Sequence, residues 1–154
     1  MYNMLDDIQS ILLLGPGPSG VAPSTYHALA RPIIGHLDPY FFKIMDEIKS
    51  GLQQLMGTKN ELTVPISGTG SAAMEAAFVN MVEQGDKVLV LINGVFGMRM
   101  ADVASRLGAE VTKLEFEWGT SVDVSKVKQQ LEKDDYDLVA VVHAETSTGV
   151  MNPV

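Results

Sequence analysis

From residue 62 onward, short apolar segments alternate with longer segments of helical pattern, and this alternation constrains the fold most strongly. Residues 87–92 (KVLVLI) and 137–142 (DLVAVV) contain no polar residue after the first. Strands that are apolar on both faces are typical of parallel sheets covered by helices on either side. The expected strands are 62–66, 87–92, 110–116 and 137–142, and the expected helices between them are 71–83, 96–107 and 125–132. We therefore expect an α/β fold with a mainly parallel sheet and helices on both faces.

The first third of the chain is richer in loops. Residues 15–19 (GPGPS) cannot continue a helix or a strand. Residues 23–30 predict a short helix with proline in its first turn, and the apolar spacing over 40–56 predicts an amphipathic helix. The chain therefore divides into an N-terminal segment, 1–60, with loops and one amphipathic helix, and a sheet region, 61–154. Because the sheet pattern stops with no helix after its last turn, we expect the second region to be truncated.

Charge and composition exclude several classes of protein. Nineteen acidic and eleven basic residues give a net charge of −8, which disfavours binding to nucleic acid or to anionic membranes. The chain has no cysteine, no basic signal-like start, and no apolar run near the roughly 20 residues of a membrane span. Three scattered histidines, including His36 in an irregular loop, do not have the spacing of metal ligands. We expect a soluble, cytoplasmic protein without a metal site.

The strongest local signal is the segment SGTGS at residues 67–71, between the expected strand 62–66 and a helix. Glycines at 68 and 70 let the backbone approach an anion, and Thr69 and Ser71 add hydroxyl groups at a helix N-terminus. A bound phosphate group and a simple tight turn capped by Thr69 or Ser71 both fit this pattern. The dinucleotide fingerprint is weakened because the next strand ends in LIN, without a carboxylate, and the P-loop lysine is absent.

Two further polar turns follow expected strands. Residues 93–97 (NGVFG) and 144–149 (AETSTG) come after the carboxyl ends of strands, which form the ligand-binding edge of an open parallel sheet. Phe96 lies between glycines, where it can either stack on a planar ring or pack under the loop. Residues 143–149 bring hydroxyls, a carboxylate and an imidazole to the same edge, although turn and cap roles account for each of them singly.

Six segments together carry a resemblance to a known family. They are 12–19 (LLLGPGPS), 35–39 (GHLDP), 44–48 (IMDEI), 67–71 (SGTGS) with 74–77 (MEAA), 93–97 (NGVFG) with Arg99, and 143–150 (HAETSTGV). In this order they resemble the N-terminal part of a class V, fold type I aminotransferase, of the alanine–glyoxylate and serine–glyoxylate (serine–pyruvate) branch. The resemblance covers nearly the whole chain. It implies that residues 61–154 are the first part of the large domain that binds pyridoxal 5′-phosphate (PLP).

The resemblance also implies roles for individual residues. The positions that match the family's binding residues are Thr69, Gly70 and Ser71 for the phosphate of PLP, Phe96 and Thr146 for its ring, and Gly17 for the side of the substrate carboxylate. The phosphate positions agree with the anion-binding interpretation of the helix N-terminus. Phe96 stands where this branch often has tryptophan, so the stacking surface is smaller.

The family's Schiff-base lysine, the aspartate that pairs with the pyridine nitrogen, and the arginine that holds the substrate all come after the position of Val154. None of the eight lysines present lies in a comparable setting, so we expect no catalytic residue in this chain. The complete enzyme is expected to be a homodimer that transfers an amino group from alanine or serine to glyoxylate or another 2-oxo acid. A PLP-dependent lyase or desulfurase-like relative, and a non-catalytic folding or interaction fragment, remain alternatives.

Overall fold

The computed structural model describes residues 7–15 and 17–154, and the chain divides into two compact units, Met1–Ile66 and Ser67–Val154. Residues 1–6 and Pro16 lie outside the described residues. They include the start of the chain, where the sequence has no basic signal-like segment, and one position of the GPGPS segment.

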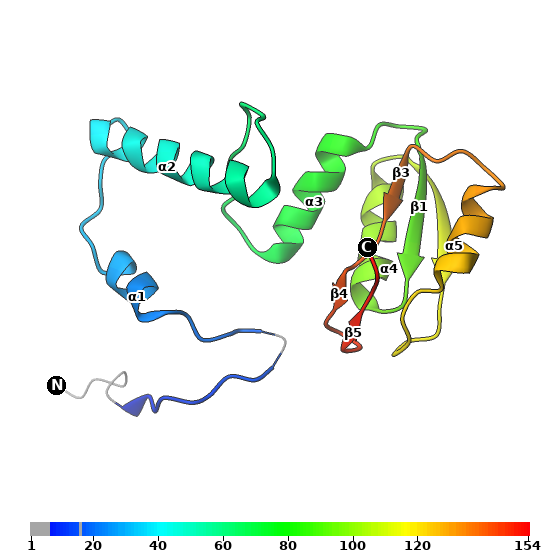
Figure 1. Cartoon of the computed structure of the whole chain (residues 1–154), viewed down its shortest axis with the longest axis horizontal. Coiled ribbons are helices and arrows are strands. Elements are labelled where there is room, and N and C mark those ends of the chain that lie inside the picture. The colour runs from blue at the N-terminus through cyan, green and yellow to red at the C-terminus, as the bar shows by residue number, and fades with distance from the viewer. Residues whose placement is uncertain (1–6, 16) are drawn as a thin grey trace. The chain divides into compact units, whose positions relative to one another are not determined.

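The N-terminal unit contains two helices, α1 (Pro23–Leu29) and α2 (Pro39–Met56), as the sequence predicts (Figure 1). Each begins with a proline in its first turn, where the missing N–H costs nothing. The Asp38 carboxylate caps α2 by accepting a hydrogen bond from the Tyr40 N–H at 2.7 Å. Gly57 ends α2 in the left-handed conformation, at φ 62°. Neither helix has a buried residue within this unit.

The second unit carries the sheet. Its elements are α3 (Gly70–Met81), β1 (Lys87–Ile92), α4 (Val95–Arg106), β2 (Glu110–Glu115), α5 (Val124–Leu131), β3 (Leu138–Ala140), β4 (Ala144–Glu145) and β5 (Val150–Met151). The first three strands form a parallel sheet in the order β2-β1-β3, and β4 and β5 form a separate antiparallel pair. The central strand, β1, is the most deeply buried element of the unit.

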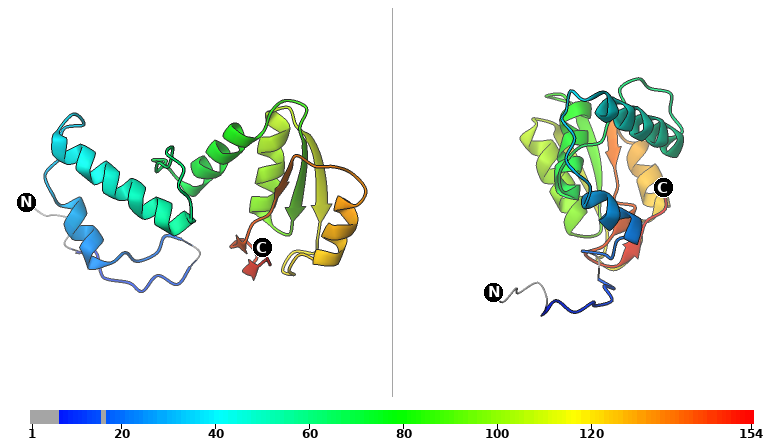
Figure 2. Two further views of the ribbon diagram at one scale, coloured as in Figure 1. Left: turned by 45° about the horizontal axis from the view of Figure 1, so that its top comes forward. Right: turned by 90° about the vertical axis from the view of Figure 1, so that its left-hand side faces the viewer.

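Both faces of β1 are covered, as its apolar sequence predicts. Val88, Val90 and Ile92 pack in a cluster with residues of α3 and α4, including Phe78 and Met100. Leu89 and Leu91 belong to a second cluster, which includes Val122 before α5 and the partly buried Val127 within it. Figure 2 shows the sheet between α4 and α5 in this unit. The expected α/β architecture, with a parallel sheet and helices on both faces, is confirmed.

One expected strand is wrong. Residues 62–66 are irregular, and the side chains of Leu62, Val64 and Ile66 are 86%, 54% and 57% exposed. Pro65 has no N–H to donate to a neighbouring strand, and the apolar residues around it find no burial within the described residues of the N-terminal unit. The segment at 67–69 therefore leads into α3 from an irregular stretch and not from a strand.

The end of the chain also differs from expectation. The strand expected over 137–142 pairs with β1 only at Leu138–Ala140, and the turn at 144–149 lies within the β4–β5 hairpin. Among the described residues, no helix is long and apolar enough to cross a membrane.

Candidate functional site

The N-terminus of α3 carries the residues that were predicted to bind phosphate. Thr69 is the cap residue, and its hydroxyl accepts a hydrogen bond from the Ala72 N–H at 3.3 Å, which confirms a capping role for Thr69. The first N–H groups of a helix have no intrahelical partner and attract anions. A Cβ added at Gly70 would meet nothing within 4 Å, so the backbone at this position is open. Capping by Thr69 therefore leaves space for an anion beside Gly70 and Ser71.

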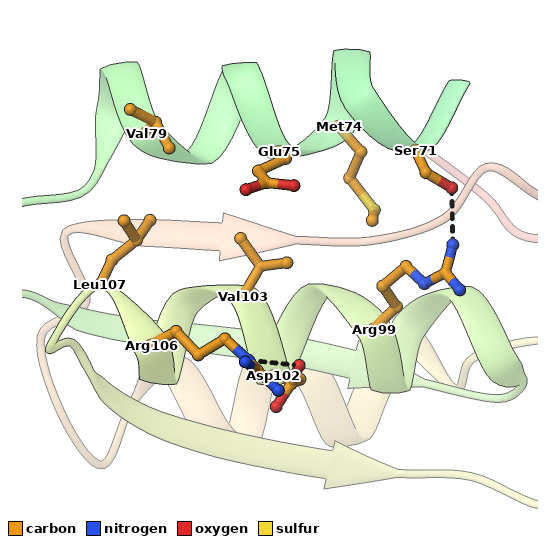
Figure 3. Close-up of a pocket in the computed structure, with 9 residues that line it drawn as sticks. All are labelled: Ser71, Met74, Glu75, Val79, Arg99, Asp102, Val103, Arg106 and Leu107. Atoms are coloured by element: carbon orange, nitrogen blue, oxygen red, sulfur yellow. Dashed lines mark hydrogen bonds and ion pairs between the residues drawn. The ribbon is translucent and has the colours of Figure 1, made fainter. Parts of the chain in front are cut away.

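Arg99 joins this end of α3 to α4. Its Nη1 donates a hydrogen bond to the Ser71 hydroxyl at 2.6 Å (Figure 3). In the same view the two helices lie side by side, with Ser71 and Arg99 at one end of a groove of about 310 Å³. Arg106, at the other end of this groove, forms an ion pair with Asp102 on its own helix at 2.8 Å. Within the described residues Arg99 has no such acidic partner, and it adds a positive charge beside the N-terminus of α3.

Phe96 lies in the first turn of α4, directly after the carboxyl end of β1. The side chain is half-buried, and the backbone N–H donates a hydrogen bond to Oε2 of Glu145 at 3.2 Å. The neighbouring N–H of Gly97 donates to the same oxygen at 3.3 Å. The turn at 93–97 and the loop at 144–149 therefore meet at the N-terminus of α4, as their expected places at the sheet edge predict.

A pair of buried amides lies beneath this junction. Asn93 and Asn152 are each 1% exposed and exchange two hydrogen bonds, from Asn93 Nδ2 to Asn152 Oδ1 at 2.8 Å and from Asn152 Nδ2 to Asn93 Oδ1 at 3.0 Å. Asn93 Nδ2 also donates to the Thr120 carbonyl, and Asn152 Nδ2 donates to the Val142 carbonyl. The pair therefore connects β1 with the segments on both sides of it.

Thr146 is exposed and lies between Glu145 and Ser147 in the β4–β5 hairpin. The structure thus brings together the α3 N-terminus, Phe96 and the loop of Thr146 within the second unit. Gly17, at φ 142°, belongs to the N-terminal unit and is described only there.

The sequence predicts no individual role for four polar residues that shape this site. They are Asn93, Arg99, Glu145 and Asn152. Asn93 and Glu145 have a visible signal, because each closely follows an apolar segment, 87–92 or 137–142. Glu145 is completely buried, whereas acidic side chains in polar turns are usually exposed. Asn152 and Arg99 reveal their roles only through contacts with residues far away in the sequence.

Comparisons with known proteins are consistent across sequence and structure. The model of the family described as "Aminotransferase class-V" matches residues 24–154. An alanine–glyoxylate aminotransferase of Rattus norvegicus is 43% identical over 93% of this chain and 34% of its own length. An (S)-ureidoglycine–glyoxylate transaminase of Bacillus subtilis is 39% identical over 92% of this chain and 34% of its own. The crystal structure of an alanine–glyoxylate aminotransferase from Nostoc sp. matches 96% of this chain with a TM-score of 0.88 and 46% identity, over 39% of that structure. The chain therefore spans little more than a third of the length of these relatives.

Proposed function

The chain belongs to the class V aminotransferase family, and we propose that it forms the N-terminal part of an enzyme that transfers an amino group to glyoxylate or another 2-oxo acid. In this proposal residues 1–60 are an N-terminal segment and residues 61–154 begin the large cofactor-binding domain. Alanine or serine is the proposed amino donor. The relatives that are named as alanine–glyoxylate and ureidoglycine–glyoxylate aminotransferases support glyoxylate as the acceptor.

One observation carries the proposal: the hydrogen bond between Arg99 and Ser71 holds the N-termini of α3 and α4 at the same end of two adjacent helices. PLP has an anionic phosphate group and a flat ring, and these helix ends fit both. Thr69, Gly70 and Ser71 would hold the phosphate at the open α3 N-terminus, with the Arg99 guanidinium beside Ser71.

The ring would lie against residues of the α4 end of the site. Phe96 would stack on it, and the exposed Thr146 hydroxyl would contact it from the β4–β5 hairpin. When bound, PLP would supply the electron sink that amino-group transfer requires, while the residues of this chain bind and orient it. The catalytic lysine and the groups that hold the substrate would come from sequence outside these residues, apart from Gly17 on the substrate side.

A homodimer and a cytoplasmic location belong to the same proposal. Neither α1 nor α2 has a buried residue, and Ile11, Leu12 and Leu14 are 74%, 80% and 85% exposed. Apolar surface of this kind is normally covered, and a second copy of the full-length protein is the proposed cover. Light scattering of the full-length protein tests the dimer, and a monomer at micromolar concentration would contradict it.

The phosphate assignment is tested by Gly70→Glu in the full-length protein. The open space at Gly70 allows the side chain without steric conflict, but the added carboxylate repels a phosphate at the helix N-terminus. We expect the variant to fold and to lose PLP on dialysis, as measured by the absorbance of PLP released in alkali. Asn80→Glu places the same charge on an exposed position of α3 and should retain PLP. Full retention of PLP by Gly70→Glu would contradict the assignment.

A further inference from the structure

The side chain of Glu145 joins two parts of the proposed site that are far apart in the sequence. Its Oε2 accepts hydrogen bonds from the N–H groups of Phe96 and Gly97, at 3.2 and 3.3 Å. Its Oε1 accepts hydrogen bonds from the N–H and the hydroxyl of Ser147, at 3.2 and 2.6 Å. The Ser147 hydroxyl in turn accepts a hydrogen bond from the Val95 N–H at 3.0 Å. We call Glu145, Ser147 and the N–H groups of residues 95–97 the Glu145 clasp.

Because Glu145 is buried, its carboxylate depends on hydrogen bonds from the protein. Glu145 is fully inaccessible to solvent, and a buried carboxyl group is costly unless hydrogen bonds satisfy both of its oxygens. The hydrogen bonds to its carboxylate come from N–H and O–H donors. Three of the N–H groups in the clasp belong to the first turn of α4, where they lack intrahelical partners. A negative group is also favoured at this end of the helix.

The backbone at Gly94 passes very close to the Glu145 side chain. A Cβ added at Gly94 would collide with the Glu145 side chain and would lie 2.7 Å from the Ser147 hydroxyl oxygen. Only glycine allows the chain before α4 to pass so close to the carboxylate. The Thr148 hydroxyl adds a hydrogen bond to the Asn93 carbonyl at 3.3 Å, from the same loop to the end of β1.

Each side of the clasp adjoins a residue that would face the cofactor ring. Phe96 donates its own N–H to Oε2, and Thr146 lies between the two residues, Glu145 and Ser147, that form the other side. Two carboxylate oxygens can accept on both sides at once, whereas a glutamine offers an acceptor to one side only. The carboxylate therefore couples the backbone at Phe96 to the backbone at Thr146.

We propose that Glu145 is a positioning residue for the cofactor: its buried carboxylate holds the backbone at Phe96 and at Thr146 in a fixed relative position, so that both side chains contact one ring. This inference rests on the proposed function, and it assigns to that site a residue that does not itself touch the ligand. Loss of the carboxylate should loosen the ring side of the site. The hydrogen bonds of Thr69 and Ser71 on the phosphate side involve Ala72 and Arg99 and no member of the clasp, so phosphate binding should depend on it far less.

The test uses the apo form of the full-length protein and its dissociation constants for PLP and for inorganic phosphate. Glu145→Gln keeps the size of the side chain, and we expect it to weaken PLP binding about tenfold and phosphate binding less than twofold. Ser147→Ala removes the bridging hydroxyl without a change of charge and should weaken PLP binding roughly threefold. Glu132→Gln, on an exposed residue after α5, makes the same charge change and should alter neither constant.

A double-mutant cycle separates positioning from general destabilisation. In a Phe96→Ala background the effect of Glu145→Gln on PLP binding should fall to about threefold or less, because most of it acts through Phe96. An undiminished effect, an equal loss of phosphate binding, or wild-type PLP affinity in Glu145→Gln would each overturn the inference. If Glu145→Gln does not fold, the same comparisons apply to Ser147→Ala. If the wild-type protein shows no saturable binding of PLP, the proposed function fails, and the inference fails with it.

Discussion

The buried amide pair allows a prediction in which the shape of a side chain is kept while its hydrogen bonding and charge change. Asn93→Asp keeps the shape of the side chain but replaces its Nδ2 donor by an oxygen. That nitrogen donates to the Thr120 carbonyl and to Asn152 Oδ1, both at 2.8 Å. After the substitution both acceptors would face a third oxygen at a site that is 1% exposed.

The expected cost follows from these contacts. Each buried acceptor that loses its donor costs about 1–3 kcal/mol, and the new carboxylate oxygen, which has no donor of its own, adds to this. Rotation of the Asn152 amide would bring its NH₂ group to the new carboxylate oxygen, but would withdraw it from the other oxygen of residue 93 and from the Val142 carbonyl. It would also turn that group toward the Val122 N–H, which now donates to Asn152 Oδ1 at 3.0 Å. Rotation would therefore satisfy one buried group and leave others without a hydrogen-bond partner. We expect a loss of about 3–5 kcal/mol in the free energy of unfolding.

The assay is thermal and urea unfolding of the full-length apo protein, followed by circular dichroism. The expected loss corresponds to a fall in Tm on the order of 10 °C. The fall should be smaller at pH 5 than at pH 8, because burial disfavours ionisation of the introduced carboxyl group, and its protonated form regains a donor. Asn80→Asp is the control, since Asn80 Nδ2 donates to the Ala76 carbonyl at 2.7 Å on the exposed surface of α3. Equal effects of the two variants, or a loss below about 1 kcal/mol for Asn93→Asp, would refute the reasoning.

Three further predictions concern the ring site, a surface ion pair and the chain by itself. Phe96→Ala should lower the affinity of the full-length protein for PLP about ten- to hundredfold with little change in apo Tm; a large fall in Tm with unchanged affinity would favour a packing role. Lys87 Nζ lies 2.7 Å from the Asp134 carboxylate and lowers the pKa of Asp134, chiefly through this hydrogen bond. Because folding lowers the pKa of Asp134, its pairing with Lys87 stabilises the fold at pH values above the unfolded-state pKa of about 3.9. This stabilisation is lost as the pH falls through the pKa of Asp134 in the folded protein. Wild type and Asp134→Asn should therefore differ in urea unfolding at pH 6 but not at about pH 2, and less in 1 M salt than at low ionic strength; a difference that persists in acid would contradict the pairing. The purified 154-residue chain should not transaminate alanine with glyoxylate, because none of its eight lysines is buried as a catalytic amine would be; one dominant lysine adduct after borohydride reduction in the presence of PLP would contradict this.

The elements of the fold that could be predicted are those whose pattern reflects burial. β1 is buried on both faces and has a continuous apolar sequence, so its bounds agree with the prediction. Residues 62–66 have the same local character, but a strand needs a partner, and a sequence pattern does not reveal one. The shortening of β3 has a similar cause, since the carbonyls of Val142 and His143 accept hydrogen bonds from Asn152 and not from a neighbouring strand.

The predicted site residues lie in turns that glycine, serine and threonine mark in the sequence. Their supports could not be predicted, because the decisive hydrogen bonds join residues 49 positions apart, from Phe96 to Glu145, and 59 positions apart, from Asn93 to Asn152. No local pattern distinguishes an acidic residue that folds inward from one that faces solvent.

The site thus has two layers with different physical requirements. Thr69, Gly70 and Thr146 are exposed, so their contacts within the chain are few and their hydroxyl and N–H groups remain available to a ligand. Glu145 and the amide pair beneath them are buried and fully hydrogen-bonded, and within the described residues no buried side-chain polar atom lacks a partner. Loops of this kind would otherwise be mobile, because polar backbone groups in an irregular loop can exchange between the chain and water. By satisfying those groups internally, the buried layer reduces the entropy that a ligand must remove when it orders the exposed layer. Substitutions in the exposed layer should therefore act mainly on ligand affinity, with a small loss of stability only at Thr69, which caps α3, whereas substitutions in the buried layer should change affinity and stability together.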